Sequence, residues 1–444
     1  CENGPPPPPW RVIRRKTGGT RTGFVIRGSD DRVYFLRTDE VLREHATAAD
    51  AIATRLIWAA GYNTPCNLVA FFRPEDLVLA PEAEGEDAPT QEDIDLVLRR
   101  ATRAPDGSLR VSLSQVVEGE PIGGWQFWGV RADDPNDVVP HEHRRDVRGM
   151  IVLSAWLNHI DTRSENNLDA WIETGDGRGY VRHYVLDASD SFGLVWHGSY
   201  LMSQRLGLSN YFDMQHVLED FFTLGLLDRP YYVDDEDRGI ATYWIGYYDI
   251  ERFDPDGWRN GYPNPAFSRA TERDRAWMAR VIAHLDREDV AAAISAGRFS
   301  RPLVPGELER IVMGRRERIL ERYLTRLSPL AEPWVEEGRL CLRDLAVTGG
   351  IREPEERRYA AHVWQGWPAR DHSRPRPMAE GDVVCVPLPA VNASAGAPAY
   401  WIVDAMVHTP GADRPGPARV HLYQIGPRSY RVVGLERPEA PTPP

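Results

Sequence analysis

Two short segments carry the side chains best suited to chemistry. The first is His159-Ile160-Asp161-Thr162-Arg163-Ser164-Glu165-Asn166, and the second is Asp187, which follows the apolar run Tyr184-Val185-Leu186. Together they supply one carboxylate that can orient a hydroxyl group. They also supply an amide and a second carboxylate that can hold a divalent cation on phosphate groups. This set of side chains, in this order, indicates phosphoryl transfer.

Each segment follows an apolar element that can fix its position. Residues 145–159 are apolar nearly all round, which predicts a buried helix that leads into the first segment. The chain after Asn166 predicts a hairpin whose second strand is buried and ends at Asp187. We therefore expect the polar side chains to be held by a buried helix on one side and a buried strand on the other.

The first segment resembles the catalytic loop of the protein-kinase-like superfamily, usually written H-R-D-L-K-P-E-N. Arg163 stands where kinases carry lysine, and the residues that match are His159, Asp161, Glu165 and Asn166. The looser pattern is similar to atypical members, such as the HipA-like toxins and the secreted and spore-coat kinases. The resemblance covers about residues 15 to 330.

Asp187 resembles the aspartate of D-F-G in the same superfamily, although Ala188 and Ser189 follow it instead of Phe and Gly. Asp190 is an alternative, because Asp190-Ser191-Phe192-Gly193 superficially resembles the same motif. Asp187 is preferred because it ends the apolar strand.

The resemblance implies a role for each side chain. Asp161 would orient the acceptor hydroxyl and take its proton late, and Arg163 would offset the charge of the transferred phosphoryl group. Asn166 and Asp187 would hold Mg²⁺ or Mn²⁺. The implied partners are ATP or another nucleotide and an acceptor of unknown kind, which can be a protein, a sugar or a small molecule.

A glycine-rich turn lies between two strands that are expected near the N-terminus. Gly18, Gly19 and Gly23 would let backbone N–H groups approach phosphate closely, so this turn can act as a flap over the nucleotide. An ordinary hairpin turn is the alternative.

Arg37 closes the third expected strand, where the superfamily carries its phosphate-binding lysine. Arginine keeps its charge and can bind phosphate through two N–H groups, but the exchange is not conservative. The helix expected over residues 47–60 carries Asp50, which the resemblance pairs with residue 37. The same Asp50 lies three residues after Thr47, as in a capping box, and the sequence favours neither role.

Composition excludes several classes of protein. The chain has 444 residues, 42% of them hydrophobic, and a net charge of −13, so it is globular and lacks the basic face that nucleic-acid binding needs. No stretch reaches the ~18 apolar residues of a membrane span. Four cysteines are too few for a disulfide scaffold, and the sequence leaves open whether Cys66 pairs with Cys341 or Cys385.

Cys1 followed by the run Pro5 to Pro9 resembles the start of a mature bacterial lipoprotein. Lipid on Cys1 would anchor the chain in the membrane, and the prolines would form a stiff, extended spacer. We therefore expect a location in the bacterial cell envelope, in the outer membrane or periplasm or at the cell surface. A chain boundary that happens to fall on cysteine is the alternative.

The expected fold class is α+β, with a two-lobed kinase-like fold and a small C-terminal β-domain. The expected parts are a tether at 1–15, a β-rich small lobe at 16–118, a helical large lobe at 119–330 and the β-domain at 331–444. Two functions fit: an envelope-anchored phosphotransferase, or a pseudokinase that acts as a surface binding or scaffold protein. Transfer of AMP on the same fold is a third possibility.

Overall fold

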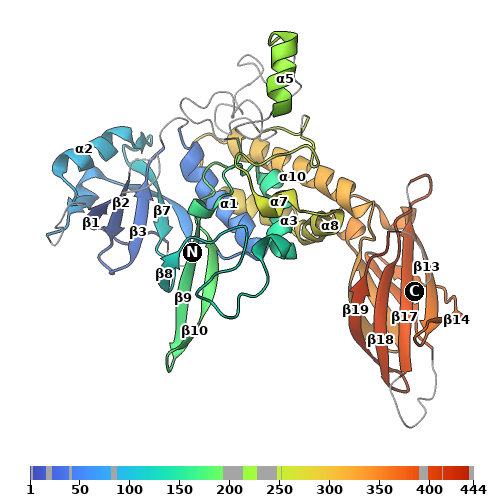
Figure 1. Cartoon of the computed structure of the whole chain (residues 1–444). Coiled ribbons are helices and arrows are strands. Elements are labelled where there is room, and N and C mark those ends of the chain that lie inside the picture. Colours follow the sequence, from blue (N-terminus) through green and yellow to red (C-terminus); the bar gives the residue numbers. More distant parts are fainter. Residues whose placement is uncertain are drawn as a thin grey trace. The chain divides into compact units, whose positions relative to one another are not determined.

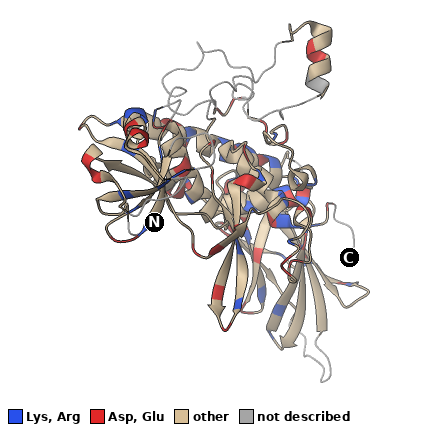
Figure 2. Cartoon of the chain, turned by 60° about the vertical axis from the view of Figure 1, so that its left-hand side comes forward, with Lys and Arg blue, Asp and Glu red and all other residues tan. Residues whose placement is uncertain are grey.

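The structure is a computed structural model that describes the chain except for residues 2–3, 17–22, 40–42, 82–87, 194–213, 228–247, 252, 390–398, 413 and 440–444. The chain divides into two compact units, Cys1–Arg269 with Arg287–Arg315 and Ala270–Asp286 with Arg316–Pro444. Both contain helices and strands, so the α+β class is confirmed, as are the additional C-terminal sheets. Charged side chains of both signs occur on the elements of each unit (Figure 2). Among the described helices, none is long and apolar enough to cross a membrane.

A seven-stranded sheet opens the first unit (Figure 1). Its order is β4-β7-β3-β2-β1-β5, with β6 paired to β7 outside this path. β1 and β5 are parallel and the other pairs are antiparallel, and apolar side chains from alternate positions form a buried core on one face. The strands are β1 (Trp10–Arg15), β2 (Gly23–Arg27), β3 (Val33–Arg37), β4 (Asn67–Phe72), β5 (Leu77–Leu79), β6 (Thr102–Arg103) and β7 (Leu109–Gln115).

The residues before β1 lie against this sheet. Pro6 is buried, and its carbonyl accepts a hydrogen bond of 2.9 Å from Trp10 Nε1. The Pro7 carbonyl accepts one of 3.1 Å from the N–H of Ser29. The expected tether is therefore corrected: residues 10–15 form a strand, and the proline run packs on a neighbouring turn instead of extending away as a spacer.

Disulfides join Cys1 to Cys66 and Cys341 to Cys385 among the described residues. Cys66 therefore pairs with neither of the partners that the sequence suggested. Cys341 and Cys385 face each other on paired strands of the second unit, which explains their choice of partner. A sulfur atom in a disulfide cannot also carry a lipid through a thioether, so this state of Cys1 and the expected lipid anchor exclude one another.

Helix α1 (His45–Ala59) packs against β4 and starts two residues earlier than expected. Its first turn is held by Asp39, whose carboxylate accepts hydrogen bonds from the N–H groups of Glu44 (3.0 Å) and Thr47 (2.9 Å). Asp50 consequently lies beyond the first turn and does not cap the helix. The capping alternative for Asp50 is wrong.

Helix α3 (Arg145–Leu157) is buried along most of its length, as expected. It ends at Asn158, which adopts a left-handed conformation with φ 52° and accepts a 2.9 Å hydrogen bond from Trp258 Nε1. The expected hairpin follows as β9 (Asn167–Gly175) and β10 (Arg178–Val185), and β8 (Glu120–Gly123) pairs with β9.

The first unit contains further helices besides α1 and α3. Helix α9 packs against α1, and α7 packs against α3. One helix begins at Leu303 in this unit, and its residues after Arg315 belong to the second unit. These helices are α2 (Gln91–Arg100), α5 (Met214–Thr223), α7 (Pro265–Ser268), α9 (Arg287–Ser295) and α10 (Leu303–Leu324).

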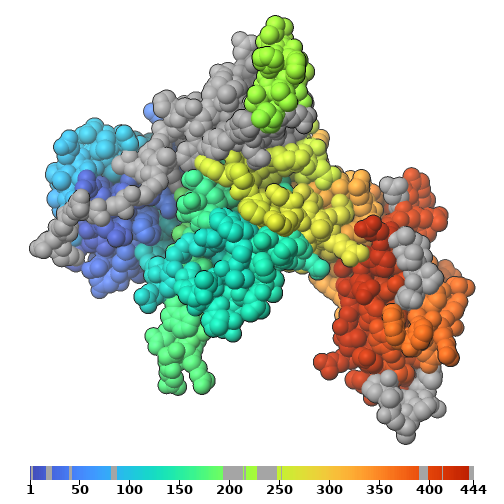
Figure 3. Space-filling view, in the orientation of Figure 1, coloured from blue at the N-terminus to red at the C-terminus, as the bar shows by residue number. Residues whose placement is uncertain are grey.

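The second unit contains two further sheets, drawn as arrows in Figure 1, and the atoms of these residues are orange to red in Figure 3. Their orders are β11-β12-β16-β15 and β14-β13-β17-β18-β19, and apolar side chains from both form one core. Helices α8 (Glu272–Ala283) and α11 (Leu345–Thr348) belong to this unit. The strands are β11 (Leu330–Glu336), β12 (Arg339–Asp344), β13 (Arg358–Gln365), β14 (Arg370–Ser373), β15 (Met378–Glu380), β16 (Val383–Pro387), β17 (Ala399–His408), β18 (Ala418–Gly426) and β19 (Ser429–Glu436).

Candidate active site

The loop after α3 is held by side chains from two other segments. Asp190 Oδ1 lies 2.6 Å from His159 Nδ1, and Asp190 Oδ2 accepts a 2.9 Å hydrogen bond from the N–H of Asp161. The side chain of Asn260 binds both backbone groups of Thr162. Its Nδ2 donates to the Thr162 carbonyl (2.9 Å), and its Oδ1 accepts from the Thr162 N–H (3.3 Å). The backbone around Asp161 is therefore fixed independently of any ligand.

Asn166 links Asp161 to the end of β10. Its Nδ2 donates a 2.8 Å hydrogen bond to the carbonyl of Asp161, and its own carbonyl accepts a 2.9 Å bond from the N–H of Leu186. Asp187 comes directly after Leu186, so the fold brings the three predicted positions 161, 166 and 187 to one end of the hairpin. Because the Asn166 nitrogen is engaged, its Oδ1 is the atom suited to a cation.

Arg37 lies between two carboxylates. Its Nη1 is 3.4 Å from Asp50 Oδ2 on α1 and 3.2 Å from Asp187 Oδ2 after β10. Burial acts to lower the pKa of Arg37, but Asp187 and then Asp50 outweigh burial and hold that pKa above its ordinary value. The ion pair between Arg37 and Asp50 is thus present, and it extends to Asp187.

Asp187 and Asp190 have different surroundings. The Asp187 side chain is 29% exposed, and its Oδ1 accepts hydrogen bonds from the N–H (3.0 Å) and hydroxyl (2.6 Å) of Ser189. Asp190 is buried and its two oxygens face His159 and Asp161. Asp187 is therefore better placed to meet a cation, and Asp190 to position the loop.

Asp161 is held close to its protonation midpoint at neutral pH. Burial and the nearby charge of Asp190 raise the pKa of Asp161 to about 7, against the opposing effects of Asn166, Arg163 and His159. A carboxylate with this pKa can accept a proton from a hydroxyl group and release it again.

The adjacent histidine gains affinity for its proton. Burial acts to lower the pKa of His159, but the charge of Asp190 and their hydrogen bond outweigh burial, so this pKa is raised. The imidazolium form therefore strengthens the contact that orients the loop.

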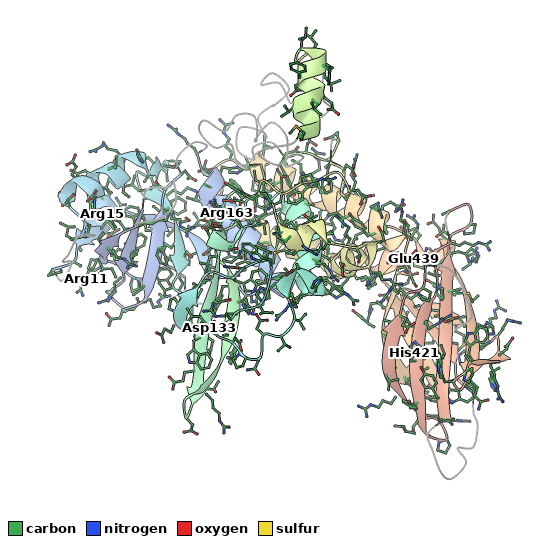
Figure 4. The ribbon with its side chains drawn as sticks, viewed as in Figure 1. Arg11, Arg15, Asp133, Arg163, His421 and Glu439 are labelled. Carbon is green, nitrogen blue, oxygen red and sulfur yellow. A yellow bond between two sulfur atoms is a disulfide. The ribbon has the colours of Figure 1, made fainter. Side chains whose placement is uncertain are left out.

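Arg163 points back to the predicted base. Its Nε is 2.8 Å from Asp161 Oδ1, and its guanidinium lies 4.6 Å from the centre of the Tyr262 ring. Figure 4 labels Arg163 at this loop. The Arg163 side chain is 38% exposed, and its expected role at the transferred phosphoryl group stays a prediction.

The glycine-rich turn is described only in part. Gly18 and Gly19 lie outside the described residues. Gly23 begins β2 directly opposite Arg37 in the ladder, where an added Cβ would lie 2.1 Å from the Leu36 carbonyl oxygen. Close backbone approach therefore requires glycine at 23, whatever the turn binds.

Sequence reasoning missed side chains that support the site. Asn67 Nδ2 donates a 2.8 Å hydrogen bond to Asp50 Oδ1 and so fixes the partner of Arg37. Asn260 holds the loop from a stretch that shows no motif. Of these supporting residues, only Asp190 stands in a recognisable sequence pattern, where it is the alternative to Asp187.

The oxygen donors suit a small divalent cation. Mg²⁺ is commonly bound by one or two protein oxygens together with substrate phosphates, and Asn166 Oδ1 with Asp187 supplies such a pair. Among the described residues, no group of three or more His, Cys, Asp and Glu side chains can hold a metal ion by itself.

Comparison with known proteins gives distant structural likenesses. No protein-family model and no curated protein matches the chain. Among solved structures, the Helicobacter pylori proinflammatory kinase CtkA is 11% identical, with 72% of this chain and 98% of that chain covered and a TM-score of 0.36. The Golgi casein kinase with Mn/ADP bound is 10% identical, with 70% and 71% covered and a TM-score of 0.31. At these scores the likenesses carry no argument about activity.

Proposed function

We propose that the first unit is an atypical kinase-like phosphotransferase that uses ATP or another nucleotide with Mg²⁺ or Mn²⁺. The observation that carries the proposal is the chain of charges Asp50–Arg37–Asp187. It joins a strand, a helix and the end of a hairpin beside the loop that holds Asp161 and Asn166. An ion pair that only stabilised the fold would not need to lie beside the loop with Asp161 and Asn166.

The roles of the side chains follow from their contacts. Arg37 binds nucleotide phosphate, while Asp50 and Asn67 hold it from behind. Asn166 and Asp187 hold the cation, which neutralises charge on the phosphates when bound.

The acceptor is activated on the other side of the loop. Asp161 orients the acceptor hydroxyl and receives its proton, and Asp190 sets the direction of Asp161 through the backbone. Arg163 moves from Asp161 to the transferred phosphoryl group. The same arrangement would serve transfer of AMP.

One observation favours the second candidate, a pseudokinase with a binding or scaffold role. Both arginines of the site face carboxylates of the chain itself, Arg37 with Asp50 and Asp187, and Arg163 with Asp161. Arginine also replaces the lysine of active kinases. A site whose charges are balanced internally can persist without substrate.

Nucleotide binding is tested by thermal shift of the full chain with ATP and Mn²⁺. We expect a metal-dependent rise in melting temperature that is lost in Asp187→Ala and kept in the control Asp95→Ala, an exposed carboxylate on α2. Absence of any shift with any nucleotide would overturn the phosphotransferase.

Turnover is tested separately with labelled ATP. Transfer of label by the parent and its loss in Asp161→Asn identify an enzyme, because Asn cannot accept the hydroxyl proton. Nucleotide binding without transfer of phosphate or AMP to protein, sugar or small-molecule acceptors identifies the pseudokinase.

An extracytoplasmic place in the bacterial envelope belongs to the same proposal. Disulfides persist in oxidising compartments, and both cysteine pairs support such a location. A lipid on Cys1 is an alternative way to hold the protein in the envelope. In that case Cys1 and Cys66 would not form a disulfide.

A further inference from the structure

The five-stranded sheet of the second unit has a pocket on the face turned away from its core. The pocket has a volume of about 660 Å³, and three of its walls are the aromatic side chains Trp367, Tyr400 and Tyr423. The opposite face of the same strands carries buried residues such as Trp401 and Leu422. Figure 4 labels His421, which lies on β18 at this pocket.

Contacts along the strands hold these aromatic rings in place. Tyr400 and Tyr423 are direct partners across β17 and β18, with ring centres 5.2 Å apart and planes at 47°. The ring of Tyr400 is nearly parallel to that of His421, and its hydroxyl lies 2.6 Å from His421 Nδ1. The pocket wall is therefore ordered before any ligand arrives, which reduces the entropy lost on binding.

Sheet stability does not explain all of the aromatic surface. Cross-strand aromatic pairs stabilise sheets, and Tyr400 with Tyr423 can be read in that way. Trp367, however, comes from the turn between β13 and β14 and is 74% exposed, so it contributes little to the core. Tyr423 is also 42% exposed. Large exposed aromatic surface beside a pocket is typical of a binding site.

The polar groups of the pocket favour an uncharged, hydroxyl-bearing ligand. Arg419 lies at the pocket, but its Nε and Nη2 are 2.7 and 2.9 Å from the two oxygens of Asp404, so its charge is already balanced. Glu436 is 64% exposed, with Oε1 3.5 Å from His421 Nε2, and its carboxylate can accept hydrogen bonds from hydroxyl groups. An anionic ligand would meet this carboxylate unfavourably.

Glycine keeps the pocket open. Gly434 is the cross-strand partner of His421, and a Cβ added there would lie 3.4 Å from His421 Cδ2, which is ordinary contact. A larger side chain at 434 would therefore fill the pocket without forcing the strand to move.

We propose that this face is a carbohydrate-binding site. A sugar ring has an apolar face of C–H groups and an edge of hydroxyl groups. Trp367 and Tyr423 would take the apolar face, and Glu436 and the tyrosine hydroxyls would take the edge. The site is independent of the phosphotransferase, because all of its residues belong to the second unit.

The test is affinity electrophoresis of the full chain in gels that contain a soluble polysaccharide. The probes are an α-glucan, a β-glucan, a xylan, a mannan and soluble peptidoglycan strands. We expect at least one probe to retard the parent, and Trp367→Ala and Tyr423→Ala to weaken binding roughly tenfold or more. Gly434→Leu should abolish it.

The matched control is Tyr180→Ala, because Tyr180 is 45% exposed on a different sheet and should leave retardation unchanged. Melting curves check that each variant is folded. The proposal is overturned if no probe retards the parent, or if the three pocket variants are all retarded as strongly as the parent. Displacement of a bound polysaccharide by aromatic peptides, but not by its own oligosaccharides, would show a peptide site and equally overturn it.

Discussion

At the scale of single residues, Asp161 imposes a pH dependence on stability. Its pKa is about 7 in the folded chain and about 3.9 in an unfolded one, so the folded state binds more protons between these values. The free energy of unfolding should therefore fall as pH rises from about 4 to about 7. Urea unfolding at about pH 5 and about pH 8 should show Asp161→Asn gaining stability relative to the parent at the higher pH. An equal change in both proteins would contradict this.

Arg37 and Asp50 give a second prediction at this scale. Asp50 is fully buried, so Arg37→Leu removes the guanidinium that lies 3.4 Å from its carboxylate and should cost about 3–5 kcal/mol of stability in urea unfolding. The double variant Arg37→Leu/Asp50→Leu should recover part of that loss, because it removes the buried charge as well. A double variant that is no more stable than the single one would show that the pair is not the cause.

The residues that could be predicted are those that stand in a local pattern. Asp161, Asn166 and Asp187 each follow an apolar element within a short stretch, so their grouping was visible in the sequence. Asn67 and Asn260 act through contacts with Asp50 and Thr162, far away along the chain. Contacts between residues so far apart in the sequence leave no pattern of local spacing from which they could be predicted.

At the scale of elements, glycine 23 should be essential to the hairpin that carries Arg37. Gly23→Ala would press Cβ against the Leu36 carbonyl and should cost about 2 kcal/mol or more. Gly306→Ala is the control, because this exposed helical position has open space and should gain up to about 1 kcal/mol. Thermal or urea unfolding of the two variants checks the difference, and equal effects would refute the argument.

The buried helix expected over residues 145–159 lies at Arg145–Leu157, close to its predicted bounds, because its run of apolar residues is strong. Helix α1 starts early because Asp39 caps it from outside the periodic stretch. Residues 10–15 were read as part of a tether because a proline run precedes them. Their pairing with β2 and β5 depends on distant segments.

At the scale of the whole molecule, the state of Cys1 can be read by mass spectrometry. We expect a non-reduced tryptic digest of protein from its native host to contain Cys1 linked to Cys66, and no lipid on Cys1. Reduction should release the two peptides. A lipid-bearing Cys1 peptide together with free Cys66 would instead establish the lipoprotein.

Apart from the tether, the predicted four-part division stays a prediction, and the two compact units show why boundaries are hard to derive. Ala270–Asp286 belongs to the second unit although it precedes Arg287–Arg315 of the first. The composition of the chain changes only after about residue 331. It therefore cannot show that the short segment Ala270–Asp286 already belongs to the second unit.

This interleaving limits how the molecule can be taken apart. A chain that ends after Arg269 lacks α9. This helix packs against α1, and its Val290 and Ile294 are buried. Helix α1 carries Asp50, so the proposed site depends on α9. In the sequence, α9 follows residues 270–286, which belong to the second unit. A catalytic fragment would have to be rejoined by a new linker across residues 270–286, because no simple truncation yields it.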